Sequence, residues 1–259
     1  MVMGALGGAL MMKFLPAGTS APVIILLVTL ASMLLGLLYS LLLAVAAINF
    51  KADQTLVGTA MNLLGTAAAT VFVKAMNTAE SVDNVSSTIQ YIEPKKAFIV
   101  NIAGFEFNWF MVLAFAALVI SYVTLYKTRF GRHIYACGGN AQAAKWSGIN
   151  ADKIKVLVFV IAGFLNGFAA IVLAGRLGGG LPSAGDGSEM DVITAVVLGG
   201  TSMTGGKGKL WGVVLGVLII GVLTVGLTMV GVSTYWQNVI KGVIIVAAVI
   251  IDTKGTKTA

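Results

Sequence analysis

VLVFVIAGFLNGFAAIVLA occupies residues 156–174, a run without a charged side chain between Lys155 and Arg176. The hydrocarbon core of a bilayer is about 30 Å thick, and a helix of about 20 apolar residues crosses it. The rest of the chain has the same character, because 58% of its 259 residues are hydrophobic and only 10% are charged. A soluble domain carries about 25% charged residues. The sequence therefore predicts an integral membrane protein.

Further apolar runs lie on both sides of this segment, and charged residues mark the links between them. The predicted helical segments are residues 1–10, 21–48, 55–73, 108–126, 156–174, 192–204, 210–230 and 239–251. The segment 192–204 is shorter and ends among glycines, which is typical of a short or broken helix. The pattern predicts an all-α integral membrane protein, a single domain over 1–259, with about eight transmembrane or partly spanning helices.

The distribution of basic residues predicts the orientation. Residues 127–155 contain six lysines and arginines but one acid, Asp152, and such an excess lies in the cytoplasm. The link 74–107, with three bases and four acids, is then external. If 192–204 crosses the membrane, the C-terminus is cytoplasmic. If that segment is re-entrant, the last two helices invert and the basic tail is external, which the same rule disfavours.

Several polar but uncharged residues lie within the predicted helices. Those that could line a translocation path are Asn62, Thr66, Asn166, Thr194 and Thr224. Such groups could replace the water around a neutral, hydroxyl-rich solute without burying a charge. The alternative is hydrogen bonding between helices, which Ser, Thr and Asn commonly make in lipid. Lys241 is the main ionisable residue in these helices, and we expect its stem to snorkel to the outer interface.

The glycine-rich stretch GTSMTGGK at 200–207 nearly matches a phosphate-binding loop. An extra glycine displaces the lysine, and Gly208 stands where Ser or Thr would bind magnesium, so phosphate binding is not predicted. The glycines are instead expected to let the backbone turn sharply within a packed bundle. With one His and one Cys, the sequence predicts no catalytic residues and no metal site.

The basic link contains a predicted short helix of about two turns. Asn140 is placed as its N-cap and Gly148 as its C-terminal stop. Its small residues, which another protein could approach closely, are Ala141, Ala143 and Ala144. The alternative is a helix that lies on the membrane surface, helped by Trp146.

Three stretches resemble the permease subunits of bacterial ATP-binding-cassette (ABC) importers of the sugar and nucleoside branch. They are GRHIYACGGNAQAAKWSGI at 131–149, SEMDVITAVVLGGTSMTGGKGKLWG at 188–212 and the closing apolar helices. In that family the segment matching 140–149 is the coupling helix, which sits in a groove of the ATPase subunit. The resemblance therefore implies an ATPase contact by Asn140, Ala141, Ala143, Ala144, Ser147, Gly148 and Ile149.

The resemblance also implies the setting of the protein. It implies a multi-pass protein of the bacterial plasma membrane, with partners that include an ABC ATPase, a second permease subunit, identical or related, and an extracytoplasmic solute-binding protein or lipoprotein. ATP and Mg would be held by the ATPase; this chain would bind no cofactor and no nucleic acid. INFKADQTLVGTAMNLLG at 48–65 looks more like nucleoside permeases than ribose permeases, which favours nucleoside uptake. Family members usually have one or two further helices before the position where this chain begins, so N-terminal helices of the family could be lacking.

Some residues keep two interpretations. Glu189 and Asp191 could cap the outer end of the short helix as an outer gate, or they could be solvated loop acids. The pairs Gly163/Gly167 and Gly212/Gly216 are typical of close helix packing, and they support association with a second permease copy. As a function, an ATP-independent channel or facilitator for neutral polar solutes is the alternative to an importer subunit.

Overall fold

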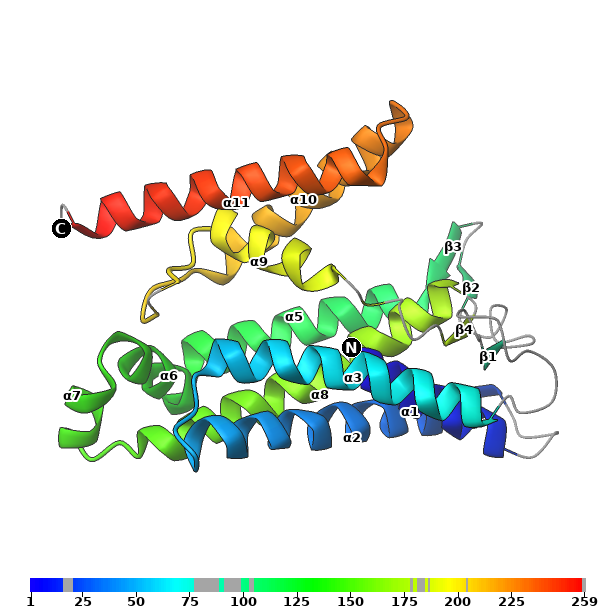
Figure 1. The fold of residues 1–259 in the computed structure, drawn as a ribbon, viewed down its shortest axis with the longest axis horizontal. Helices are drawn as coiled ribbons and strands as arrows, with labels where there is room; N and C mark the ends of the chain where they lie inside the picture. Colours follow the sequence, from blue (N-terminus) through cyan, green and yellow to red (C-terminus); the bar gives the residue numbers. More distant parts are fainter. Residues whose placement is uncertain are drawn as a thin grey trace. The chain divides into compact units, whose positions relative to one another are not determined.

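The computed structural model is mainly helical and describes residues 1–15, 21–76, 89–90, 99–102, 105–177, 179–180, 185, 187–203 and 205–257 (Figure 1). Two compact units divide the chain. The first unit combines Met1–Leu118 with Asp152–Gly185, and the second unit combines Val119–Ala151 with Asp186–Ala259. The prediction of a single domain over 1–259 stays a prediction.

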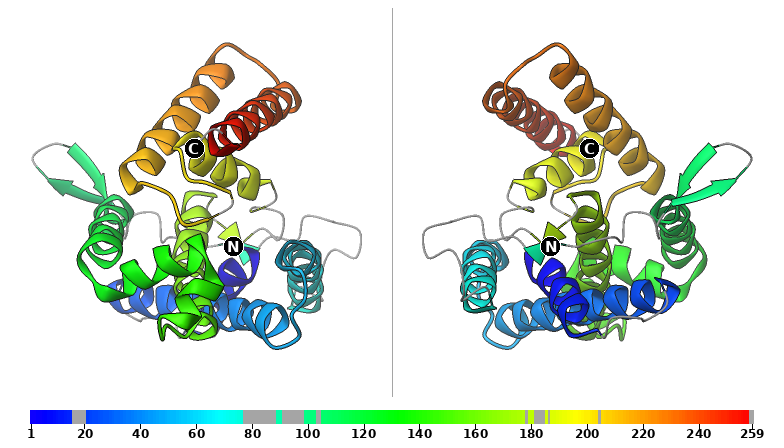
Figure 2. Two further views of the ribbon diagram at one scale, coloured as in Figure 1. Left: turned by 90° about the vertical axis from the view of Figure 1, so that its left-hand side faces the viewer. Right: turned by 90° about the vertical axis from the view of Figure 1, so that its right-hand side faces the viewer.

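Among the described residues, the first unit contains four helices and the start of a fifth. Figure 2 shows the ribbon from two further directions. The helices of the first unit are α1 (Val2–Phe14), α2 (Ala21–Ile48), α3 (Gln54–Met76), α8 (Ala151–Leu177) and the first part of α5 (Trp109–Lys127). Its strands form two antiparallel pairs, β1 (Ile89–Gln90) with β4 (Gly179–Gly180) and β2 (Ile99–Ile102) with β3 (Phe105–Asn108). These short strands leave the predicted all-α class unchanged.

Small residues let α1, α2 and α8 approach closely. The Ser32 hydroxyl is fully buried and lies 2.5 Å from the Gly4 carbonyl oxygen and 2.9 Å from that of Gly167. One turn further along α2, a Cβ built on Gly36 would lie 2.6 Å from the Gly163 carbonyl oxygen. Another turn on, the Ser40 hydroxyl donates to the Phe159 carbonyl at 2.6 Å. Serine and glycine spaced four residues apart therefore form one face of α2 that packs on α8.

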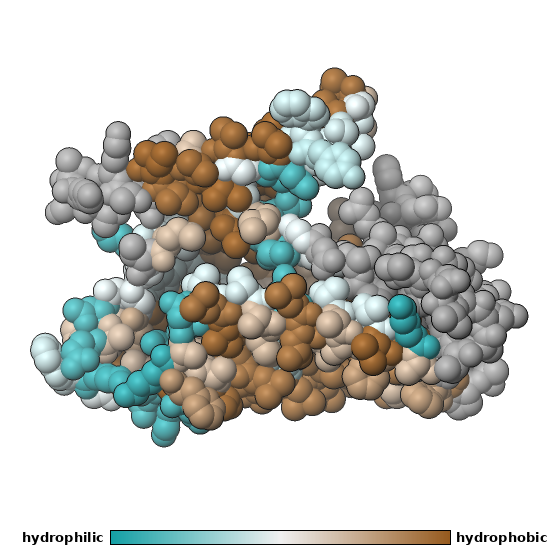
Figure 3. Space-filling view, viewed as in Figure 1, coloured by the Kyte–Doolittle hydropathy of each residue, from teal (hydrophilic) through white to brown (hydrophobic). Residues whose placement is uncertain are grey.

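The turn between α2 and α3 caps the following helix. Asp53 Oδ1 accepts hydrogen bonds from the Thr55 amide at 2.8 Å and the Leu56 amide at 3.1 Å. These bonds hold the pKa of the Asp53 carboxyl below its usual value. Figure 3 shows apolar side chains along α2 and α3 and hydrophilic side chains near this turn. The apolar stretch is the part suited to lipid, and the capped turn is suited to its polar edge.

The described part of the second unit contains the end of α5 and five further helices, α6 (Arg129–Gly139), α7 (Ala141–Trp146), α9 (Ser188–Leu198), α10 (Leu210–Met229) and α11 (Thr234–Lys257). Gly216 packs so closely on α9 that a Cβ there would overlap the Ala195 carbonyl oxygen. Gly163 and Gly167 likewise pack on α2. Close packing is confirmed for both glycine pairs, and their contacts are with helices of this chain; association with a second permease copy stays a prediction.

All eight predicted segments form helices, but one of them has different bounds and one further helix was not predicted. The short helix predicted over 192–204 begins and ends earlier, at Ser188–Leu198. Its 11 residues extend about 16 Å, roughly half the bilayer core, so it can span only partly. The helix α6 was missed, because its glycines and arginines resemble a loop.

Length and composition make four of the described helices candidates to cross a membrane, namely α2, α3, α8 and α10. A fifth candidate is α5 with α6, a pair bent by 72° at the break between them. The predicted multi-pass membrane protein is therefore confirmed. Most of the predicted external link 74–107 lies outside the described residues, so its position stays a prediction.

We predict opposite effects for the same substitution at two helical glycines of the first unit. Gly36→Ala should lower the thermal unfolding midpoint, because overpacking of this kind costs about 1–3 kcal/mol. Gly58→Ala is the matched control: a Cβ there meets nothing within 4 Å, and alanine gains about 0.5–1 kcal/mol in a helix. The midpoints are measured in lipid nanodiscs, and equal midpoints for the two variants would contradict the packing of α2 on α8.

Candidate functional site

The short helix α7 begins at the predicted cap. The Asn140 backbone is extended, with φ −155° and ψ 102°, and its Oδ1 accepts the amides of Gln142 and Ala143, each at 3.0 Å. An asparagine in this position satisfies two of the amides that a helix start leaves without partners. The predicted N-cap is confirmed.

The C-terminal end of α7 is also fixed by specific hydrogen bonds, at Gly148. Gly148 has a φ of +81°, its amide donates to the Lys145 carbonyl, and the Ile149 amide donates to the Ala144 carbonyl, both at 3.0 Å. This pair of bonds is a Schellman motif, which glycine adopts without steric cost. The predicted stop at Gly148 is confirmed, so α7 is a rigid projection with both ends fixed.

The exposed side of α7 differs in part from the predicted one. Ala144 is only 4% exposed and faces the interior of the protein, so it cannot belong to an outward surface. Ala143, Ser147 and Gly148 are exposed, and Trp146 is 82% exposed. Ala141 and Ile149 are half-buried. The available surface therefore combines small residues with one large aromatic ring, a type of side chain enriched at protein interfaces.

The residues predicted to line a path are divided between the two units. Asn62 and Thr66 lie one turn apart on α3 and Asn166 lies on α8, whereas Thr194 on α9 and Thr224 on α10 belong to the second unit. Each threonine hydroxyl donates to the carbonyl four residues earlier, at 3.1 Å for Thr66, 2.6 Å for Thr194 and 2.8 Å for Thr224. These donors are satisfied within their own helices. The predicted path role stays a prediction.

The bonds between helices come from residues that the sequence interpretation did not select. Besides Ser32 and Ser40, the Tyr39 hydroxyl donates to the Met61 carbonyl and joins α2 to α3. The four-residue spacing of small residues along α2 was the signal available for the two serines. Nothing in the sequence pattern singled out Tyr39.

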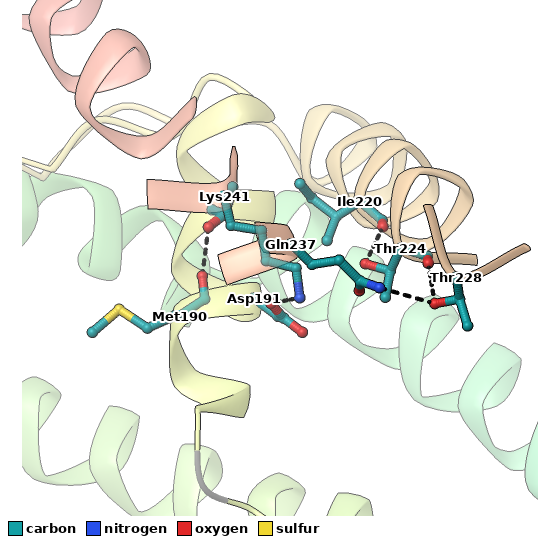
Figure 4. A network of polar contacts seen from close by, with 8 residues as sticks. Met190, Asp191, Ile220, Thr224, Thr228, Gln237 and Lys241 are labelled. Carbon is teal, nitrogen blue, oxygen red and sulfur yellow. Dashed lines mark hydrogen bonds and ion pairs between the residues drawn. The ribbon is translucent and has the colours of Figure 1, made fainter. Parts of the chain in front are cut away.

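An ion pair with one buried partner joins α9 to α11 (Figure 4). Lys241 Nζ lies 2.6 Å from Asp191 Oδ1, and the Lys241 side chain is 9% exposed, against 41% for that of Asp191. The prediction that Lys241 snorkels to the interface was therefore wrong, because a carboxylate on a neighbouring helix neutralises its ammonium group. Glu189 and Asp191 lie in the first turn of α9 rather than before it, and the N-cap is Gly187.

A glutamine extends the polar cluster beside this ion pair. Gln237, one turn before Lys241, is 5% exposed, and its Nε2 donates to the Val232 carbonyl at 2.9 Å and to Thr228 Oγ1 at 3.2 Å. Figure 4 shows that Gln237 and Lys241 point from α11 toward α10 and α9. No three His, Cys, Asp or Glu side chains among the described residues are grouped to hold a metal ion.

Helices long enough to cross a membrane, a short half-helix and an exposed capped helix in a basic link are typical of a multi-pass membrane protein of the transport class. Residues 1–249 match the family described as branched-chain amino acid transport system / permease component, and the chain belongs to this family. No solved structure matches the chain.

Several similar curated proteins are named as sugar permeases. The chain is 50% identical over 149 residues to the xylose transport system permease protein of Haemophilus influenzae, covering 57% of this chain and 40% of that protein. It is 50% identical over 144 residues to the ribose import permease protein of Bacillus subtilis, covering 56% and 44%. The corresponding Escherichia coli K12 ribose protein is 47% identical over 146 residues, covering 56% and 44%.

These matches span less than half the length of each relative. The resemblance to ABC importer permeases of the sugar branch is confirmed. The preference for a nucleoside stays a prediction, since these relatives are named for ribose and xylose.

We predict that replacing Asp191 and replacing Lys241 lower the stability of the protein by different amounts. Asp191→Asn should lower stability by about 1–3 kcal/mol, because it leaves a buried ammonium group unpaired. Lys241→Met should cost less, since the remaining carboxylate is partly solvated, and the double variant should recover much of the loss from Asp191→Asn. Thermal unfolding in nanodiscs gives the ranking.

Glu189→Gln is the control for this series. Glu189 and Asp191 share the first turn of α9, so both carboxylates interact with the helix dipole, worth about 0.3–1 kcal/mol. An equal loss from Glu189→Gln and Asp191→Asn would mean that the dipole, and not Lys241, accounts for the effect.

Proposed function

We propose that this chain is the permease subunit of an ATP-driven importer for a neutral pentose, and that ATP is hydrolysed by a separate ABC ATPase. The observation that carries the proposal is α7, a rigid exposed helix in the basic link of a chain from a permease family. The chain itself acts as a path and a coupling element, not as an enzyme.

The geometry of α7 supports a role in coupling. Its ends are fixed by Asn140 and Gly148, so a push on its exposed side moves the helix as a body instead of unwinding it. A docked ATPase could approach Ala143 and the exposed ring of Trp146 closely. The surrounding lysines and arginines support a cytoplasmic position for this surface under the positive-inside rule, and the proposal puts the C-terminus on the same side.

The chemistry of the helices supports a neutral solute. The ion pair of Asp191 with Lys241 is neutralised internally, and the residues proposed to line the path carry only hydroxyls and amides. The relatives named for ribose and xylose favour a free pentose. A nucleoside, which carries a ribose, is the second candidate because of the stretch at 48–65.

The proposal includes partners and a place in the cell. An importer of this kind needs two ATPase sites, a second permease subunit and an extracytoplasmic binding protein or lipoprotein that delivers the solute, in a bacterial plasma membrane. The binding protein supplies the selectivity, so weak contacts from Asn and Thr side chains suffice within the path.

We expect uptake to depend on ATP. Proteoliposomes that contain the permease with its ATPase should import ribose or xylose presented by the binding protein, and the import should stop when ATP is removed. The panel includes a nucleoside and galactose. Uptake that persists without ATP would favour the channel alternative. ATP-dependent uptake of the nucleoside, but of none of the sugars, would mean that the solute is a nucleoside and not a pentose.

We expect loss of the α7 cap to uncouple the transporter. Asn140→Ala removes a cap worth about 0.5–2 kcal/mol, so uptake should fall severalfold while the ATPase still hydrolyses ATP. Asn140→Asp keeps the capping oxygen and is the matched control. A second pair is Gly148→Val against Gly148→Asn, because asparagine tolerates positive φ and valine does not.

Wild-type ratios of uptake to hydrolysis in both Asn140→Ala and Gly148→Val would remove α7 from the coupling step. A co-purification assay with the ATPase distinguishes loss of docking from loss of transmission.

A further inference from the structure

The loop that joins α9 to α10 lies against the end of α6. Its described parts are residues 199–203 and 205–209. Gly205 and Gly206 have φ values of +90° and +74°, a conformation that glycine adopts at little cost. Both residues face the backbone of α6, where a Cβ on Gly205 would lie 2.7 Å from the Gly138 carbonyl oxygen.

The approach of the two backbones leaves no room for side chains from either direction. A Cβ on Gly138 would lie 2.7 Å from the Gly206 amide nitrogen, and a Cβ on Gly206 would lie 2.5 Å from Gly139 Cα. Real Cβ atoms do not approach other atoms so closely. The end of α6 and this loop therefore form a direct backbone joint.

Two tyrosines fasten the same joint. The Tyr135 hydroxyl on α6 donates to the Gly208 carbonyl at 3.1 Å. The Tyr126 hydroxyl, near the end of α5, accepts the amide of Leu210, the first residue of α10, at 2.9 Å. The ring of Tyr122 contacts those of Tyr126 and Trp211. The joint thus combines backbone contact with directional hydrogen bonds.

Backbone hydrogen bonds within the loop, and between the loop and α9, restrict its conformation. The Ser202 amide donates to the Lys207 carbonyl at 3.0 Å, and the Gly205 amide donates to the Ser202 carbonyl at 3.2 Å. At its start, the Thr201 amide donates to the Val196 carbonyl of α9 at 3.2 Å. A displacement of α6 would therefore reach α9 instead of being absorbed by the loop.

These contacts connect both candidate sites of the second unit. The helix α6 leads directly into α7 through Asn140, and the loop leads directly into α9, which carries Asp191. We propose that the glycine loop at 199–209 is a positioning element that carries the movement of α7 to α9 and its ion pair with Lys241. This inference rests on the proposed coupling role of α7.

The first test uses the chain alone in nanodiscs and needs no ATPase. Hydrogen exchange of the α9 amides should rise about 2- to 10-fold in Tyr135→Phe, which removes the hydrogen bond to the Gly208 carbonyl, and at least as much in Gly206→Ala. Tyr122→Phe is the matched control, because it removes a hydroxyl from the same aromatic group while Tyr135 keeps its bond. Exchange in α3 is the internal reference for general destabilisation.

An increase confined to 199–209, with α9 unchanged in both variants, would overturn the link. So would an equal increase in the Tyr122→Phe control or in α3, because the effect would then be general loosening.

The second test uses the complex with its ATPase. Tyr135→Phe should raise the ATP consumed per imported solute severalfold, while hydrolysis without solute and docking of the ATPase stay at wild-type levels. A wild-type ratio in both Tyr135→Phe and Gly206→Ala would overturn the proposal. If the wild-type complex shows no ATP-dependent uptake, the proposed function fails, and the exchange experiment still decides whether α6 and α9 are linked.

Discussion

The need to satisfy every backbone amide and carbonyl without water governs this structure. In lipid an unpaired backbone group costs several kcal/mol, so crossing segments are helical and turns must lie against protein or at the interface. Polar side chains follow the same constraint. Thr66, Thr194 and Thr224 donate their hydroxyl protons to carbonyls of their own helices, and Asp53 and Asn140 cap the starts of two helices. Where a hydroxyl joins two helices, its partner is a backbone carbonyl: Ser32 donates to glycine carbonyls and Ser40 to that of Phe159.

The same constraint explains why glycine does so much of the packing. Lipid tails are as apolar as leucine, so helices gain little from burying large side chains together and more from close backbone contact. Gly36 lies against α8, and Gly216 lies against α9. Leucines and valines are correspondingly left exposed toward the solvent of the helices, which is lipid. Glycines in this chain are therefore better evidence of contacts within the protein than of a surface for a second copy.

Local signals in the sequence were sufficient for local structure. Charge-free runs located eight helices, and the chemistry of Asn140 and Gly148 located both ends of α7, because a cap acts over three or four residues. Contacts between distant segments carry no such signal. The pairing of Lys241 with Asp191, 50 positions away, and the burial of Ala144 depend on how helices pack. The helix α6 was hidden by glycines that serve the joint at Gly138, so its low helix propensity reflects a tertiary contact.

The glycine loop connects the half-helix α9 to α6, so movement of α6 can be passed to α9. The helix α9 is held at its first turn by Lys241, in its middle by the close packing of Ala195 on Gly216, and at its end by the loop and by Gly212. Packed helices can slide past one another by small amounts, so a short helix can shift as a body when one end is moved. The end near the loop faces α6, and the other end carries the acids Glu189 and Asp191. Movement at the basic link therefore has a route, through α6 and the glycine loop, to the acidic end of α9.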